Sequence, residues 1–170
     1  MKLVRESLLE FHQTGDPLGA LNICPYQAYI DAIFHGLNLQ KESYKVINKK
    51  TVFSGNFSIS ELHSKALTEL PDNLTVYGDL NLYNCKALPA LPNGLNVIGS
   101  LYLNRCISLS ELPNDLKVGG ILCLYKCKLT VLPDNLKVGE AIWVGPNQTE
   151  LIKFIMQSKF KDKLKLYKER

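Results

Sequence analysis

Residues 67 to 147 consist of four consecutive copies of one segment of about 21 residues. The copies begin at Leu67, Leu88, Leu109 and Leu129, so the first two steps are 21 residues long and the third is 20. The shorter step removes one residue between copies three and four. A fixed period of this length is typical of one supersecondary unit stacked on copies of itself. We therefore expect this part of the chain to form a solenoid.

Each copy contains a pair of aliphatic residues separated by a single residue. The pairs are Leu80/Leu82, Leu101/Leu103, Leu122/Leu124 and Ile142/Val144. Alternation of this kind predicts a short strand that buries the pair and turns the intervening residue to the opposite face. Three residues after each pair stand Cys85, Cys106, Cys127 and Asn147. This pattern resembles the strand of a leucine-rich repeat, and the resemblance implies that these four side chains turn inward and bond the backbone of neighbouring copies.

A proline precedes a short polar turn in every copy, at Pro71, Pro92, Pro113 and Pro133. Proline followed by Asn, Asp or Gly favours a tight turn and leaves no room for a full helix. The resulting pattern L-x-x-L-P-x-x-L, with L-x-L-x-x-(C/N), resembles the short leucine-rich repeat of bacterial effectors and small bacteriophage proteins. The resemblance covers about half of the chain. It implies an α/β, β-rich solenoid whose parallel β-sheet lies on the concave face.

The segments on either side of the repeats do not follow the pattern and are interpreted as caps, because the open ends of a stack expose apolar side chains. Residues 1–66 are predicted to form an N-terminal cap of two helices, at 3–11 and 25–34, and a β-hairpin around 48–50. Residues 148–170 are predicted to form a basic amphipathic C-terminal helix, with Asn147 and Glu150 in capping-box spacing. Pro146 is expected to end strand pairing after the fourth copy.

Composition describes a folded, single-domain chain of 170 residues, with 46% hydrophobic and 21% charged residues. No segment has the pattern of a signal peptide or a transmembrane helix, so we expect a bacterial cytoplasmic or virion location. The five Cys are expected to be reduced thiols. The net charge of +4 comes from residues 148–170, which hold seven Lys/Arg and three Asp/Glu.

No catalytic or metal-binding motif is found. His12, His35 and His63 have no ligand-spaced Cys and no linked nucleophile, and no glycine-rich phosphate loop occurs. Similar repeats occur in bacterial ubiquitin ligases, whose separate catalytic domain carries a Cys followed closely by an acidic residue. None of the five Cys here has Asp or Glu at the next two positions. We expect a non-enzymatic protein without a cofactor or metal.

The residues between the paired aliphatics are expected to form a binding face on the strand side. Tyr and Trp are enriched among interface hot spots. Basic residues next to the inward Cys positions would supply charges at the rim of the face. The predicted partner-binding residues are Asn81, Tyr83, Tyr102, Asn104, Cys123, Tyr125 and Trp143, with Arg105 and Lys126 at the rim. Aromatic residues also favour strands without any partner.

A protein partner, from the host or the phage, is the expected ligand of this face. One alternative is a structural or virion-associated component that assembles on itself or on a particle. A second is binding of nucleic acid or a membrane surface through the basic C-terminal helix. The aromatic residues favour the protein partner over these alternatives.

Overall fold

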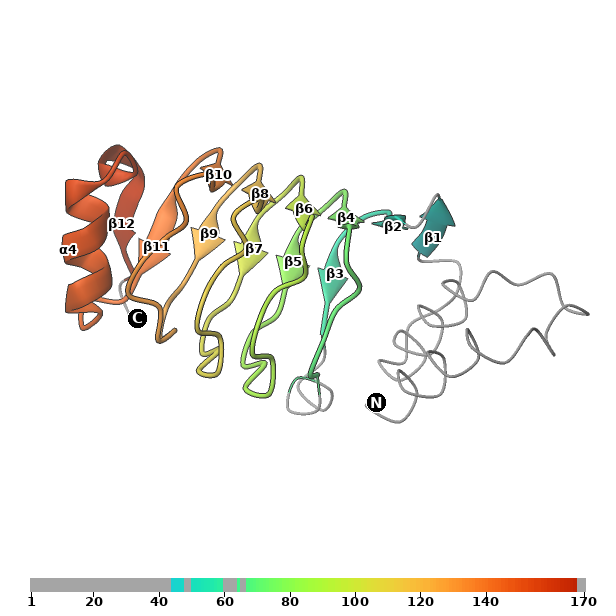
Figure 1. Cartoon of the computed structure of the whole chain (residues 1–170), viewed down its shortest axis with the longest axis horizontal. Helices are drawn as coiled ribbons and strands as arrows, with labels where there is room; N and C mark the ends of the chain where they lie inside the picture. Colours follow the sequence, from blue (N-terminus) through green and yellow to red (C-terminus); the bar gives the residue numbers. More distant parts are fainter. Residues whose placement is uncertain (1–43, 48–49, 60–63, 65–66, 168–170) are drawn as a thin grey trace, which may run out of the picture.

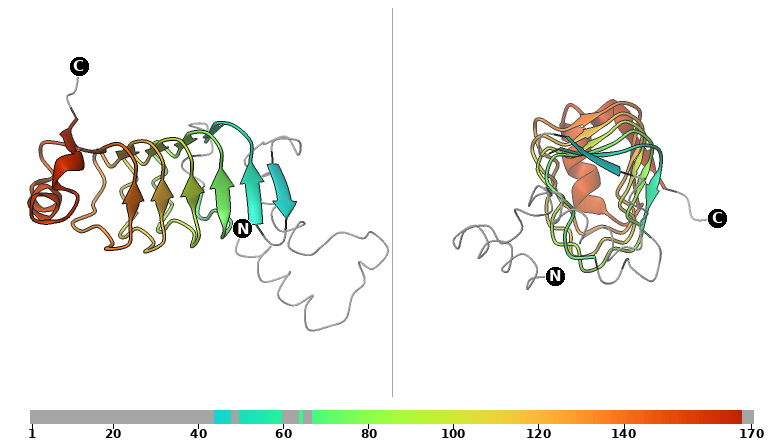
Figure 2. Two further views of the ribbon diagram at one scale, coloured as in Figure 1. Left: turned by 90° about the horizontal axis from the view of Figure 1, so that it is seen from above. Right: turned by 90° about the vertical axis from the view of Figure 1, so that its right-hand side faces the viewer.

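The computed structural model describes residues 44–47, 50–59, 64 and 67–167. These residues form mainly parallel β-strands, joined by loops and accompanied by few helices, in an α/β arrangement (Figure 1). The two predicted N-terminal helices lie outside the described residues, as do Cys24 and the three His. The copies follow one another along the long axis of the molecule and superpose when viewed down that axis (Figure 2).

One six-stranded sheet, which we call sheet B, contains the paired aliphatics of every copy. Its strands lie in the order β12-β11-β9-β7-β5-β3, and all of its pairings are parallel. Their bounds are β3 (Phe57–Ser58), β5 (Leu80–Asn81), β7 (Leu101–Tyr102), β9 (Leu122–Cys123), β11 (Ile142–Val144) and β12 (Leu164–Leu166). The expectation of a parallel sheet built from equivalent positions of the copies is therefore confirmed.

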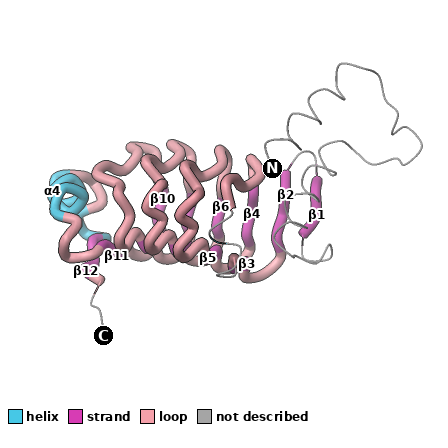
Figure 3. Tube along the Cα trace, turned by 90° about the horizontal axis from the view of Figure 1, so that it is seen from below, coloured by secondary structure: helices cyan, strands magenta, loops and turns pink. Residues whose placement is uncertain are grey.

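A second six-stranded sheet, sheet A, has the order β1-β2-β4-β6-β8-β10. Its strands are β1 (Tyr44–Ile47), β2 (Lys50–Phe53), β4 (Leu74–Val76), β6 (Asn96–Val97), β8 (Lys117–Val118) and β10 (Lys137–Val138). Only one sheet was expected from the sequence. The turn after each Pro is followed by a second aliphatic pair, such as Leu74 and Val76, and this pair also alternates with period two. Each copy thus contributes one strand to each sheet, with loops between them (Figure 3).

The inward side chains of both sheets form one contiguous apolar cluster. Leu74, Val76, Leu80 and Leu82 of the first copy are fully buried, and their equivalents in later copies are also buried. Burial of each such side chain stabilises the fold by about 1.5–3 kcal/mol relative to exposure. The predicted register, with the paired aliphatics pointing inward, is therefore observed.

The N-terminal edge of sheet A is an antiparallel hairpin. Strands β1 and β2 pair with Tyr44 opposite Phe53 and Ile47 opposite Lys50, as predicted from the β-branched and aromatic residues there. Strand β2 then pairs in parallel with β4 of the first copy. The hairpin thus extends sheet A beyond the repeats.

The C-terminal segment differs from the predicted single helix. Helix α4 spans Thr149–Gln157 and is followed by a short 3-10 helix, η2 (Lys161–Lys163), and by strand β12. The Ser158 hydroxyl donates to the Ile155 carbonyl (2.9 Å) and accepts from the Phe160 N–H (3.2 Å), which closes the last turn of α4. Leu151 and Ile155 are the buried side chains of α4.

Strand pairing also continues beyond Pro146, contrary to expectation. The sequence Leu164-Lys165-Leu166 alternates with period two and pairs in parallel with Ile142–Val144. A proline placed after the last strand residue does not remove any of the ladder hydrogen bonds of β11. The tail therefore supplies a sixth strand to sheet B (Figure 1).

Candidate functional site

The outer surface of sheet B carries the residues predicted to bind a partner. We call it the aromatic face and define it by Asn81, Tyr83, Tyr102, Asn104, Cys123, Tyr125, Trp143 and Tyr167. Its first row follows the strand register from Asn81 to Tyr102, then to Cys123, Trp143 and Lys165. The sequence placed the first four of these side chains in one row, and the structure does the same.

Tyr102 and Trp143 are half-buried, which fits aromatic side chains lying on the outside of a sheet. Cys123 stands between them and is only 3% exposed, although we predicted it to be a surface residue. It lies outside the core cluster, so its burial comes from its neighbours on the outer face. A small side chain between two large ones on adjacent strands is shielded from solvent. Cys123 is therefore not available to a partner.

Tyr125 is also buried, for a reason that the sequence did not reveal. The ring of Tyr167 stacks on it with centroids 4.5 Å apart and planes at 22°. Tyr167 meets Trp143 edge-on at 6.1 Å. The C-terminal segment therefore covers the Tyr125 end of the aromatic face and replaces it with Tyr167, which remains partly exposed.

The predicted rim residues Arg105 and Lys126 are exposed and lie against aromatic rings. Both have positive φ, 63° and 59°, as does Asn84 at the equivalent position of the first copy. The Arg105 guanidinium lies 5.7 Å from the centroid of Tyr83, and the Lys126 ammonium lies 4.8 Å from that of Tyr125. Cation–π contacts of this kind hold both charges at the border of the aromatic face.

Two polar atoms of the aromatic face are buried without a hydrogen-bond partner among the described residues. They are Trp143 Nε1, which is a donor, and Asn104 Oδ1, which is an acceptor. Buried polar atoms of this kind are uncommon in folded proteins. The face therefore carries one unused donor and one unused acceptor beside its aromatic rings.

Two of the inward cysteines, Cys106 and Cys127, perform the backbone-bonding role expected of them. The Cys106 thiol donates to the Leu82 carbonyl (3.1 Å), and the Cys127 thiol donates to the Leu103 carbonyl (2.9 Å). Burial raises the pKa of Cys85 and Cys127 to about 12 and that of Cys106 and Cys123 to about 11. These thiols stay protonated at neutral pH, so they are poor nucleophiles and poor metal ligands.

In the fourth copy, Asn147 was expected to be the inward residue that bonds the backbone. This prediction is wrong, because Asn147 is exposed. Gln148 takes the place, and its amide nitrogen donates to the carbonyls of Leu124 (3.0 Å) and Cys127 (2.9 Å). Gln148 is also the N-cap residue of α4, so the capping box predicted for Asn147 and Glu150 does not form. The spacing of 21 residues from Cys127 to Gln148 carried this signal in the sequence.

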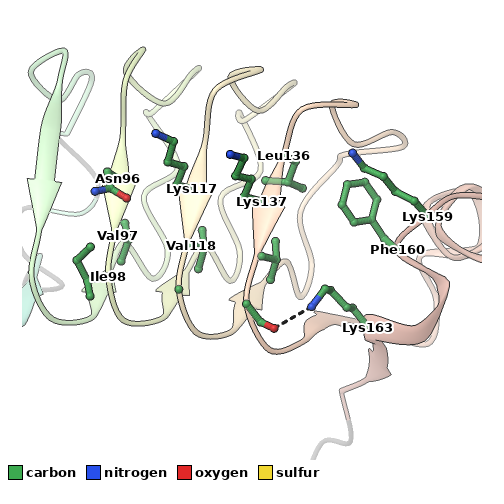
Figure 4. Close-up of a pocket in the computed structure, with 13 residues that line it drawn as sticks. Asn96, Val97, Ile98, Lys117, Val118, Leu136, Lys137, Lys159, Phe160 and Lys163 are labelled. Carbon is green, nitrogen blue, oxygen red and sulfur yellow. Dashed lines mark hydrogen bonds between the residues drawn. The ribbon is translucent and has the colours of Figure 1, made fainter.

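A second surface feature lies on the outer side of sheet A and was not anticipated. It is a hollow of about 540 Å³ between β6, β8, β10 and the segment after α4 (Figure 4). We call it the basic hollow. No acidic side chain lines it. Four lysines border it, namely Lys117, Lys137, Lys159 and Lys163. Gly119 and Gly139 keep it open where earlier copies carry the exposed side chains of Tyr77 and Ile98.

Sequence reasoning missed Tyr167, Gln148 and the basic hollow. The tail was interpreted as one helix, and helical spacing assigned Tyr167 to an apolar stripe, although the alternation in Leu164-Lys165-Leu166 indicates a strand. Two lysines of the hollow, Lys117 and Lys137, come from separate strands 20 residues apart, and the other two, Lys159 and Lys163, come from the tail.

No protein-family model, curated protein or solved structure matches the chain. A helix that spans a bilayer needs about 20 apolar residues, and no helix within the described ranges has that length and character.

Proposed function

We propose that this chain is a leucine-rich repeat solenoid of the short bacterial or bacteriophage class, that it binds another protein through the aromatic face, and that it performs no catalysis. The parallel pairing of equivalent positions in successive copies supports the solenoid. The protonated, buried thiols of the described residues support a binding function over nucleophilic chemistry.

One observation carries the proposal: Tyr102 and Trp143 lie half-exposed on the outer side of one rigid sheet, two strands apart, with buried Cys123 between them. Two aromatic side chains beside a small one form a notch that a partner side chain can fill. Tyr and Trp contribute large contact areas at a low cost in side-chain entropy.

Four short strands present a modest surface, and the tail enlarges it. Tyr167 adds a further partly exposed ring beside Trp143, and Arg105 adds an exposed charge at the rim. Central aromatic anchors with charges at the rim are the usual arrangement at protein interfaces.

The alternative of nucleic-acid or membrane binding through a basic helix receives less support. Helix α4 has nine residues and ends before most lysines of the tail. Lys159 and Lys163 donate to the carbonyls of Asp134 and Gly139, and Lys153 pairs with Glu150. The charges are thus spread over several elements instead of one amphipathic face.

The proposal is tested by site-specific photo-crosslinking in a bacterial lysate. A photoreactive phenylalanine at position 102 is expected to capture a discrete protein, and the same group at position 77, on the outer side of sheet A, is not. Tyr77 is the matched control because it is 62% exposed and directly follows strand β4 of the other sheet.

The crosslinked product is expected to disappear in a Trp143→Ala background that retains its circular dichroism spectrum and melting temperature. Equal capture from positions 77 and 102, or an unchanged product in the Trp143→Ala background, contradicts binding through the aromatic face.

A further inference from the structure

The two sheets end differently at the C-terminal side of the molecule. In sheet B, strand β12 pairs with β11 and covers the last copy. In sheet A, β10 is the last strand, and no described strand pairs with its outer edge. The segment that follows α4 lies opposite this edge and reaches it through two lysine side chains, which donate to the carbonyls of Asp134 and Gly139; Figure 4 shows the bond made by Lys163.

The hydrogen bonds of sheet A show which groups this edge leaves open. The Leu95 and Leu116 carbonyls accept from the N–H groups of the next copy, at 3.2 and 3.1 Å. The Val97 and Val118 carbonyls do the same at 2.9 Å. The equivalent carbonyls of the fourth copy, Leu136 O and Val138 O, accept no hydrogen bond from any residue that the structure describes.

These two carbonyls belong to residues that line the basic hollow. The other lining residues include apolar ones such as Phe160 and Ile98, and four lysines, Lys117, Lys137, Lys159 and Lys163. Lys117 and Lys137 are opposite one another in the register of β8 and β10 and are exposed. The edge of β10 therefore combines two carbonyls that accept no hydrogen bond from the described residues with apolar residues and a group of lysines that no lining acidic side chain opposes.

We propose that β10 and the basic hollow form a docking site for an extended acidic peptide segment of a partner protein, which adds to sheet A as a further parallel strand. Its N–H groups donate to Leu136 O and Val138 O, as the next repeat would. Side chains alternate along a strand, so one set points inward, as Leu136 and Val138 do, and the other lies beside Lys137. Acidic residues in the second set are directly opposite that lysine, which is a favourable cross-strand pair.

The same lysines argue against pairing between copies of this chain. The tail strand β12 contains Lys165, and a basic strand placed beside Lys137 is repelled. Lysines at a sheet edge commonly prevent such self-association. The charge of the hollow thus selects an acidic strand and rejects the chain's own. This site is separate from the aromatic face, and neither proposal depends on the other.

The test uses fluorescence anisotropy with the full chain and a labelled peptide of eight residues that alternates Glu and Val. We expect saturable binding that is at least tenfold tighter than that of the matching Lys and Val peptide. Alternate peptide nitrogens form two sets, and only one set can donate to Leu136 O and Val138 O. N-methylation of that set is expected to weaken peptide binding at least tenfold. Equal binding of the native peptide and of the peptides methylated in either set overturns strand addition.

Two double substitutions distinguish binding in the hollow from a general effect of the positive charge of the protein. Lys117→Gln with Lys137→Gln is expected to weaken peptide binding at least tenfold. Lys86→Gln with Lys128→Gln makes the same charge change at exposed positions away from the hollow and is expected to have less than a twofold effect. Equal losses in both pairs, no binding of the acidic peptide, or tighter binding of an eight-nucleotide oligothymidine each overturn the proposal.

Discussion

The side-chain amide nitrogen of Gln148 lies 3.0 Å from the main-chain oxygen of Leu124, one copy back in the stack. The Cys127 thiol has the same relationship to Leu103, and the Cys106 thiol to Leu82. A glutamine can take the place of a cysteine because both donate one bond inward. Its second amide hydrogen and its oxygen then satisfy further groups, namely the Cys127 carbonyl and the N–H groups of Lys126 and Gly145.

Gln148→Ala is expected to destabilise the chain by about 2–3 kcal/mol, because it leaves several partly buried main-chain groups without partners. Urea unfolding followed by circular dichroism measures the change. Gln157→Ala is the matched control, because Gln157 is exposed at the end of α4 and should change stability by less than about 0.5 kcal/mol. Similar effects of the two substitutions would contradict the role assigned to Gln148.

The buried thiols predict a loss of stability in alkaline solution. Their pKa values rise from 9.0 to about 11 or 12 on folding, so below pH 9 both states are protonated and the full contribution is present. Above pH 9 the unfolded chain releases the proton and the folded chain does not. Each thiol should then lower the free energy of unfolding by about 1.4 kcal/mol per pH unit up to its folded pKa.

Urea titrations between pH 8 and pH 11 measure this slope. Cys85→Ala removes one thiol and should make the slope shallower by about 1.4 kcal/mol per pH unit. The same series at pH 6 to 8 is the control, since neither state ionises there. An identical alkaline slope in the two proteins would show that the thiol is not protected.

Gly139→Ala is expected to destabilise sheet A by about 2 kcal/mol or more, through strain of the backbone. A Cβ at this position would lie 1.8 Å from the main-chain oxygen of Gly119 in the preceding copy. A main-chain atom cannot move aside as the end of a flexible side chain can. Thermal unfolding measures the effect. Glu140→Ala, at the adjacent exposed position, is the control and should leave the melting temperature nearly unchanged. A Gly139→Ala protein with unchanged stability would contradict the close approach of these strands.

Trp143 is the only tryptophan of the chain and reports on the aromatic face by fluorescence. Tyr167→Ala removes the ring that lies edge-on to it, so its emission should shift to longer wavelength and acrylamide should quench it more strongly. The Tyr77→Ala control concerns the other sheet and should change neither quantity. Unchanged emission in Tyr167→Ala would show that the tail does not cover this face in solution.

Much of the fold could be predicted because it depends on periodicity. Leu80/Leu82 and their equivalents recur at a constant step, and the alternation within each pair predicts which side chains point inward. The same rule applied to Leu74 and Val76 would have predicted sheet A. The tail was misinterpreted because a helical stripe and a short strand such as Leu164-Lys165-Leu166 can share one stretch of sequence.

The candidate site could be predicted only in part. The strand register fixed the row of Asn81, Tyr102, Cys123 and Trp143, because residues at equivalent positions of a parallel stack must be neighbours. The exposure of each side chain was a different question. It depends on the sizes of the neighbours and on the tail, and this is why Cys123 and Tyr125 are buried.

The amino-acid sequence by itself determined the repeating unit, the direction of strand pairing and the inward register, since these follow from local alternation repeated at a fixed period. Only the tertiary structure decided that the tail stacks Tyr167 on Tyr125, that Gln148 takes the position of the inward cysteines in the last copy, and that no strand of the described residues pairs with β10 beside the four lysines. Those outcomes depend on where a non-repeating segment meets the last copy. The repeat period does not predict these contacts, because they depend on packing and hydrogen bonding between residues far apart in the chain.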